Sequence, residues 1–165
     1  MNSGLQIKTV HTDAELELFS PVIRRAFLTV AEEFHLTPET APTNPAYAGV
    51  ESLIAMRDRG IQLYGAWHAS RPAGFVALED AGDGLFYLER LAVLPDLRHR
   101  GYGTDLIRFA EERARQQGGR SISIGIIYEN TILRSWYIQY GFQETGTKSF
   151  PHLPFTVGFL KLDLV

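Results

Sequence analysis

The 165-residue sequence contains no cysteine and only two methionines and two tryptophans. The lack of cysteine excludes disulfides, thiolate metal sites and a cysteine nucleophile. Long apolar runs are missing too, since no segment approaches the roughly 20 residues that cross a bilayer. The first residues, MNSGLQIKTVHTD, lack the apolar stretch and cleavage site of a secretory signal. We therefore expect a cytoplasmic protein.

An excess of charge of one sign is also missing. Sixteen Lys and Arg residues against 19 Asp and Glu give a formal net charge of −3, which argues against nonspecific nucleic-acid binding. The five histidines show no metal-ligand spacing, so we expect no metal. With 45% hydrophobic and 21% charged residues, the composition is that of a globular protein. The length fits a single domain over residues 1–165.

Hydrophobic periodicity, caps and turn residues predict alternating strands and helices. Strands are expected at residues 5–10, 61–68, 73–79, 85–94, 121–128, 141–147 and 155–164, and helices at 13–34, 46–59, 101–117 and from Asn130 to about Tyr140. A proline-rich loop is expected at 36–45 and a turn at 80–84. Strands at both ends with alternation in the middle indicate an α/β fold, with a mixed sheet covered by helices on both faces.

The most informative stretch is LFYLERLAVLPDLRHRGYGTDL, residues 85–106. An apolar strand runs into a loop with two glycines, Gly101 and Gly103, and a helix follows. Glycine allows the backbone to turn tightly and to approach a ligand closely. The helix start leaves unpaired N–H groups at the positive end of the helix dipole. Because Arg98 and Arg100 add donors and charge, the loop is predicted to bind a pyrophosphate.

Two common phosphate loops do not fit this stretch. A Walker loop needs a lysine after its last glycine, whereas Thr104 follows Gly103. A dinucleotide-binding fingerprint needs a third glycine where Leu106 stands, and it usually belongs to the first strand–helix unit of its domain.

A third pattern matches. The spacing Arg98-x-x-Gly101-x-Gly103, after a strand ending LAVLP, resembles the acetyl-CoA loop of the GCN5-related N-acetyltransferases (GNAT). A second pattern resembles the other signature of this family: Asn130 is followed seven residues later by Tyr137, and Gly141-Phe142 comes four residues after that. The resemblance spans roughly residues 75–147. It implies the GNAT fold: a central mixed, mostly antiparallel sheet of about seven strands, with a splayed strand pair that holds CoA.

The resemblance also implies an activity. Acetyl-CoA would be the cosubstrate, and the acetyl group would pass directly from its thioester to a primary amine of a small molecule or peptide. The implied cofactor-binding residues are Leu91, Ala92, Val93, Arg98, His99, Arg100, Gly101, Tyr102, Gly103, Thr104 and Asn130. For Asn130, a role as N-cap of the following helix is at least as good a reading.

Two residues are candidates for catalysis. Tyr137 stands where the family places a general acid, and a phenol with a pKa of about 10 keeps its proton at neutral pH. Tyr140, three residues further on, is the alternative candidate for this general acid. Glu89 is the candidate base, because Tyr87, Glu89, Leu91 and Val93 share a parity and are expected to face one side of the strand. The alternative for Glu89 is an ion pair with Arg90 or Arg98.

The acceptor is expected near the first two helices and the final hairpin. These segments hold Glu32, Glu33, His35, Thr37, Thr43, Asn44 and His152, with Phe34, Tyr47, Phe150 and Phe155 as aromatic candidates. A noncatalytic acyl-CoA-binding or sensing module on the same fold is the main alternative. The sequence leaves the acceptor and the oligomeric state open, with a homodimer as one alternative.

Overall fold

The computed structural model describes residues 4–164. Within them the elements follow in the order β1 (Leu5–Thr9), α1 (Asp13–Glu33), α2 (Val50–Asp58), β2 (Gln62–His68), β3 (Arg71–Gly82), β4 (Leu85–Val93), a 3₁₀ turn (Pro95–Leu97), α3 (Tyr102–Gln116), β5 (Ser121–Ile127), α4 (Thr131–Tyr140), β6 (Gln143–Ser149) and β7 (Thr156–Asp163). None of the helices in this part of the chain is long and apolar enough to cross a membrane.

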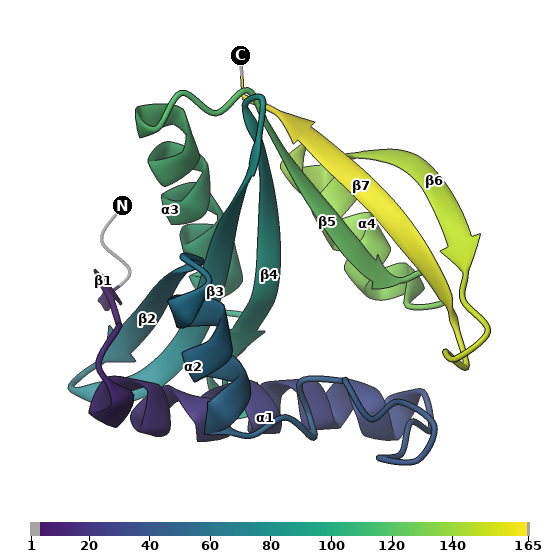
Figure 1. The fold of residues 1–165 in the computed structure, drawn as a ribbon, viewed down its shortest axis with the longest axis horizontal. Helices are drawn as coiled ribbons and strands as arrows, with labels where there is room; N and C mark the ends of the chain where they lie inside the picture. Colours follow the sequence, from purple (N-terminus) through teal and green to yellow (C-terminus); the bar gives the residue numbers. More distant parts are fainter. Residues whose placement is uncertain (1–3, 165) are drawn as a thin grey trace.

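The seven strands form one sheet in the order β1-β2-β3-β4-β5-β7-β6 (Figure 1). Every neighbouring pair is antiparallel except β4 and β5, which run parallel. This confirms the predicted mixed, mostly antiparallel sheet.

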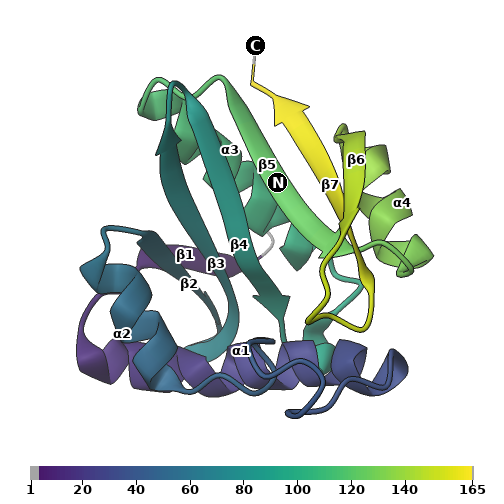
Figure 2. The ribbon, with the colours of Figure 1, turned by 45° about the vertical axis from the view of Figure 1, so that its right-hand side comes forward.

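The parallel pair is splayed. Its ladder joins Leu85–Tyr87 to Ser121–Ser123 and extends no further, and the two strands then separate (Figures 1 and 2). The remainder of β4 therefore presents an edge on this side that β5 does not pair, with backbone N–H and C=O groups available to a ligand.

A bulge accompanies this separation. Glu89 lies opposite Ala77, but the next registered pair is Ala92 with Phe75, so that Arg90 and Leu91 together oppose Val76. Arg90 has a φ of 52°, in the left-handed region that few non-glycine residues adopt. Since a bulge bends its strand and increases the local twist, it accounts for part of the divergence from β5.

Helices cover both faces of the sheet, as predicted. On one face α1 and α2 contribute Phe19 and Leu53 to a core that includes Phe75 of β3. On the other face α3 packs Leu106 and Ile107 into a core with Phe86 and strand β5, to which α4 adds Tyr137. Helix α1 begins with a complete capping box between Thr12 and Glu15, which satisfies two amides that the first turn leaves unpaired.

A third small core joins the loop after α1 to the final hairpin. Ala31, Leu36, Ala41 and Ala46 are buried there, and Phe155 of the β6–β7 connection packs against them. Figure 2 shows the tip of this hairpin beside the C-terminal part of α1. The contact closes the end of the gap between β4 and β5 that lies farthest from their ladder.

Two predicted boundaries were wrong by three residues or more. Helix α2 begins at Val50 rather than at residue 46, because side-chain bonds hold the preceding segment in turns: Asn44 Oδ1 accepts from the Ala46 amide at 2.9 Å, and the Tyr47 hydroxyl donates to the Leu36 carbonyl at 2.7 Å. Strand β3 continues to Gly82, into the expected turn, with Asp80 paired to Phe86.

Candidate active site

A cavity of about 910 Å³ opens between the splayed strands β4 and β5. This size suits a small-molecule site. Its walls contain twelve of the thirteen residues that the sequence singles out: Glu89, Leu91, Ala92, Val93, Arg98, His99, Gly101, Tyr102, Gly103, Thr104, Asn130 and Tyr137. The remaining one, Arg100, is exposed in the loop and is not part of the lining.

The loop before α3 has the geometry of an anion site. Gly101 is the N-cap residue, with a φ of 83°, and no side chain caps the helix. The bond from the Asp105 amide to the Gly101 carbonyl, at 3.0 Å, closes the first turn. The amides of Tyr102, Gly103 and Thr104 precede that bond, so the helix leaves them available to a ligand at its positive end.

Gly103 has a packing role that the sequence does not indicate. A Cβ at this position would lie 3.2 Å from the indole of Trp136, so the glycine allows α4 to pack closely against the start of α3. The side chain of Tyr102 is also committed elsewhere, because it is buried and its hydroxyl is 2.7 Å from His68 Nδ1. Only the backbone of Tyr102 remains for a cofactor.

Arg98 and Asn130 both make structural bonds. Arg98 Nη2 donates to the Ala26 carbonyl at 2.8 Å, which ties the loop to α1, and burial lowers the pKa of this guanidinium. Asn130 Oδ1 accepts from the Leu133 amide at 3.2 Å, which confirms the N-cap reading. Each side chain keeps further N–H donors with which it could contact a cofactor.

Tyr137 is buried in the wall formed by α4. Its ring makes edge contacts with Trp136 and Phe142, at centroid distances of 5.0 and 5.3 Å. Within residues 4–164 its hydroxyl makes no hydrogen bond, and burial alone raises its pKa further above the ordinary value for a phenol. Its competitor Tyr140 is tied to α3, since its hydroxyl donates to Glu111 Oε1 at 2.7 Å. Tyr137 is therefore the available proton donor of the two.

Glu89 is half-buried and has an unusual titration. Burial is the largest cause that raises its pKa to about 7, followed by a hydrogen bond and charge repulsion from Glu79, while Arg59 and Arg90 oppose the shift. Glu79 lies on β3 opposite Tyr87, diagonally across the ladder from Glu89. Among the described residues, neither Arg90 nor Arg98 is within 4.0 Å of the Glu89 carboxylate, so neither forms a direct ion pair with it.

The parity argument for Glu89 was also wrong. Leu91 packs against the core on the α3 face and Val93 contacts both cores, whereas Glu89 pairs with Ala77 of the core on the α1 face and is influenced by Arg59 at the end of α2. The bulge at Arg90 shifts the alternation by one residue. Glu89 nevertheless lines the cavity, because the gap beside β4 is open toward both faces of the sheet.

The other end of the cavity lies between α1, the α1–α2 loop and the β6–β7 hairpin. It is lined by Phe27, Val30, Glu33, Ala41, Thr43, Asn44, Pro45, Leu153 and Phe155. Of the predicted acceptor residues, Glu33, Thr43, Asn44 and Phe155 are in this wall, whereas Glu32, His35, Thr37, His152, Phe34, Tyr47 and Phe150 are not. The sequence reading missed Arg90 as a lining residue, since a bulge leaves no clear mark in an apolar strand.

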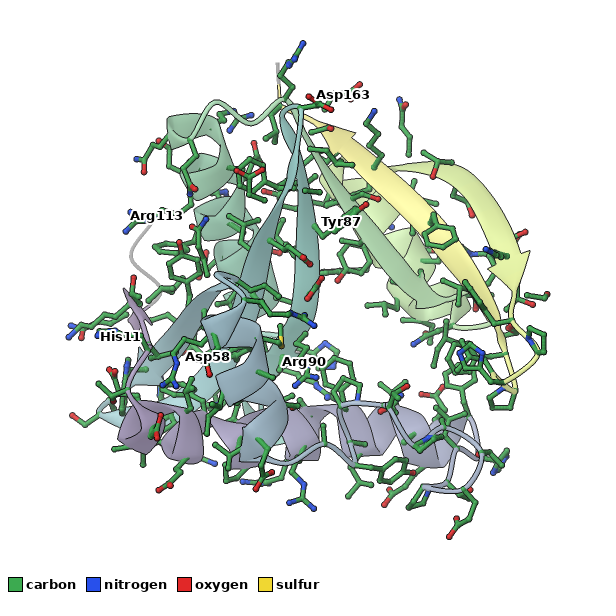
Figure 3. All side chains as sticks on the ribbon, viewed as in Figure 1. His11, Asp58, Tyr87, Arg90, Arg113 and Asp163 are labelled. Atoms are coloured by element: carbon green, nitrogen blue, oxygen red, sulfur yellow. The ribbon has the colours of Figure 1, made fainter. Side chains whose placement is uncertain are left out.

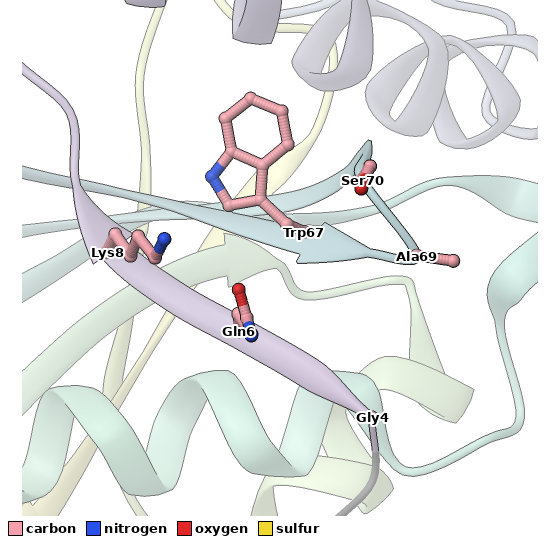
Figure 4. Close-up of a pocket in the computed structure, with 6 residues that line it drawn as sticks. All are labelled: Gly4, Gln6, Lys8, Trp67, Ala69 and Ser70. Carbon is pink, nitrogen blue, oxygen red and sulfur yellow. The ribbon is translucent and has the colours of Figure 1, made fainter.

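A second hollow, of about 510 Å³, lies at the β1 edge of the sheet (Figure 4). Gln6, Lys8 and Trp67 line it, with Ala69 and Ser70. It contains none of the predicted site residues, and Lys8 is its one ionisable side chain. Among the described residues no group of three or more His, Asp or Glu side chains is placed to hold a metal ion.

The sequence model of the Acetyltransferase (GNAT) family matches residues 26–142, which include the splayed β4 strand, the loop and α4. The chain belongs to this family. The PaiA N-acetyltransferase from Thermoplasma acidophilum, solved with coenzyme A, is similar in fold, with a TM-score of 0.80 and 19% identity over 96% of this chain and 98% of that one. The yncA protein from Salmonella typhimurium, solved with acetyl-CoA, gives a TM-score of 0.72 and 15% identity over 98% and 95%.

A curated relative is more similar in sequence but much longer. The amino-acid acetyltransferase from Azotobacter vinelandii is 36% identical over 76 residues, which are 46% of this chain and 16% of that protein. The chain therefore spans only a small part of this relative, and the two solved GNAT structures establish the fold alone.

Proposed function

We propose that the protein is an acetyl-CoA-dependent N-acetyltransferase, which moves an acetyl group directly from the CoA thioester to a primary amine of a small molecule or peptide. One observation carries the proposal: a single cavity contains an unpaired strand edge, an uncapped helix start, a carboxylate with a pKa of about 7 and a buried phenol. The family and the CoA-bound neighbours support the same chemistry.

The two ends of CoA suit two different features of the cavity. The free edge of β4 around Leu91–Val93 can pair with the amides of the pantetheine arm, as an added strand would. The amides of residues 102–104, with Arg98 and His99 nearby, suit the pyrophosphate. A backbone N–H of β4 can polarise the thioester carbonyl in the manner of an oxyanion hole.

The reaction then needs two proton transfers. The amine nitrogen attacks the thioester carbon, the C–S bond breaks, and an amide and free CoA result. Glu89, directly or through a water molecule, takes the proton that the amine loses. Tyr137 gives its proton to the departing thiolate. Because the new bond forms between acetyl-CoA and the amine themselves, no acetyl group is carried by the protein.

The proposal is tested by calorimetry with acetyl-CoA and by CoA release in the presence of a panel of primary amines. We expect acetyl-CoA to bind and CoA to be released only when a suitable amine is present. Binding without release on any amine would support the sensing module instead, and NADH binding tighter than CoA would contradict the assignment of the loop.

The pyrophosphate position can be tested by adding a negative charge. Thr104→Glu places a carboxylate in the first turn of α3, where it should repel the pyrophosphate but interact favourably with the helix dipole. We expect acetyl-CoA affinity to fall about 10- to 100-fold, with the melting temperature unchanged or raised.

Thr104→Gln is the matched control, because it has nearly the same shape as Thr104→Glu without the charge. It should weaken binding much less, and added salt should reduce the difference between the two variants. Equal acetyl-CoA affinities for the two variants would mean that the pyrophosphate does not bind at the start of α3.

A further inference from the structure

The bulge in β4 sets two oppositely charged neighbours on the same face of the strand. In a regular strand, Glu89 and Arg90 would point to opposite faces. Here Leu91 packs on the α3 face, while Arg90 reaches across the other face to α2, where its Nη1 donates to Ser52 Oγ at 2.8 Å. Glu89 lies on that same face, and both residues line the cavity. Figure 3 shows Arg90 between α2 and the open gap beside β4.

Arg90 lacks a partner for its charge. Its guanidinium is half-buried, and burial lowers its pKa even though the nearby Glu89 carboxylate acts in the opposite direction. Across residues 4–164, no carboxylate is within 4.0 Å of it, and Ser52 accepts its one side-chain hydrogen bond. A guanidinium has five donors in a planar fork that fits a carboxylate with two parallel bonds. Arg90 thus keeps donors for an anionic group in the cavity.

The backbone at Arg90 gives a second, independent indication. A left-handed φ of 52° is unfavourable for a residue with a long side chain. Such strain persists where the surrounding structure imposes it, often at binding sites. The bulge at Arg90 is what turns the guanidinium toward α2 and the cavity.

We propose that Arg90 determines acceptor specificity by binding a carboxylate close to the reacting amine, so that the acceptor is an α-amino acid with an apolar side chain. The proposal rests on the proposed function, in which Glu89 faces the amine. Glu89 and Arg90 are consecutive and line the same cavity, so an acceptor with its ammonium and carboxylate on one carbon atom can contact both side chains. Phe27, Val30 and Phe155 offer an apolar wall for the side chain.

A carboxylate bound by Arg90 would distinguish free amino acids from peptides and polyamines as acceptors. The N-terminus of a peptide has an amide where a free amino acid has its carboxylate, and polyamines have no anionic group. Arg59 and Glu79 are the other charged groups that act on Glu89 from α2 and β3. Glu79 would repel a carboxylate placed next to Glu89, which leaves the Arg90 side of the pair as the position for the anion.

The test compares acceptors that differ only in the carboxylate. Initial rates with acetyl-CoA are measured for leucine, methionine and phenylalanine, for their primary amides and for the amines without a carboxyl group, and kcat/KM is expressed per neutral amine. We expect at least one of the amino acids to exceed its amide and its amine by about 10-fold or more. Arg90→Gln should raise KM for the amino acid about 10- to 100-fold more than KM for its amide, because any change in the pKa of Glu89 that follows the loss of the Arg90 charge affects both acceptors alike.

Ser52→Ala is the matched control, because it removes the bond between Arg90 and α2 and keeps the guanidinium. If Arg90 only anchored α2, Ser52→Ala would reproduce the effect of Arg90→Gln, and both would act equally on acids and amides. Either result overturns the proposal, as would preferred acetylation of the amides or amines by the unaltered protein. If acetyl-CoA binds and no amine of any class is acetylated, the proposed function itself fails.

Discussion

Tyr137→Phe should lower kcat by about 10²–10⁴-fold while acetyl-CoA affinity stays nearly unchanged, because the variant removes only the proton that the thiolate needs. The phenylalanine ring can keep both edge contacts, with Trp136 and Phe142. Within the described residues the hydroxyl makes no hydrogen bond, so its loss leaves no partner unsatisfied, and the melting temperature should change little. Steady-state kinetics, calorimetry and thermal unfolding measure the three quantities.

Tyr140→Phe is the control for this experiment. Tyr140 lies one turn further along α4 and donates to Glu111, so its loss should cost about 1 kcal/mol of stability and leave kcat unaltered. A wild-type kcat for Tyr137→Phe, or a similar fall in kcat for both variants, would contradict the assignment of Tyr137 as the acid.

Glu89→Gln should lower kcat/KM about 100-fold or more, with the largest loss in a bounded pH window. Below pH about 7 the wild-type carboxyl is protonated and cannot accept a proton, so the advantage of the wild type shrinks there. Near pH 10, the pKa of a Lys-like amine, more of the acceptor arrives already neutral, and the advantage shrinks again. The pH–rate profiles of both proteins should therefore differ most between these limits.

Glu89→Gln should raise the stability of the folded protein above pH 7 although it lowers activity. Because folding raises the pKa of Glu89, the folded state binds more protons than the unfolded state between the ordinary carboxyl pKa and about 7. Stability is lost across this window as pH rises, and Glu89→Gln avoids that loss. We expect the variant to melt at a higher temperature than the wild type above pH 7. A lower melting temperature and a constant rate ratio across pH would instead indicate a structural ion-pair role.

Glu79→Gln provides the matched control for the pH dependence. Glu79 raises the pKa of Glu89 through a hydrogen bond and its charge, so removing the charge should move the acidic limb of the wild-type profile to lower pH. The variant keeps Glu89 and should keep activity at pH 8. An acidic limb that does not move would mean that a group other than Glu89 titrates in the profile.

The sequence predicted those parts of the fold and site that depend on local signals. The glycine loop, the cap at Asn130 and the strand–helix alternation follow from backbone requirements that particular residue types meet. The bulge at Arg90 could not be predicted, because LERLAV reads as an uninterrupted strand and the shift depends on pairing with β3. The packing of Gly103 against Trp136 was missed for a similar reason, since the two residues are 33 positions apart in sequence.

The orientation of side chains at the end of the cavity where the acceptor is expected could not be predicted from the sequence either. The aromatic and acidic residues of residues 27–47 could be placed in one region, but periodicity does not say which of them face inward. Asn44, which holds a turn through the Ala46 amide, is in the cavity wall, whereas Tyr47, whose hydroxyl donates to the Leu36 carbonyl, is outside it. Such side-chain bonds join loops to distant segments, and a single sequence does not display them.

The most direct test of acetyl transfer is a rapid-quench single turnover with acetyl-labelled acetyl-CoA, excess enzyme and a pool of primary amines that includes the amino acids. The account predicts that label leaves CoA and appears in an amine at the same rate, with none bound to the protein at any time. Label that remains on CoA with every amine, or that accumulates on the protein before it reaches an amine, would contradict direct transfer in this cavity.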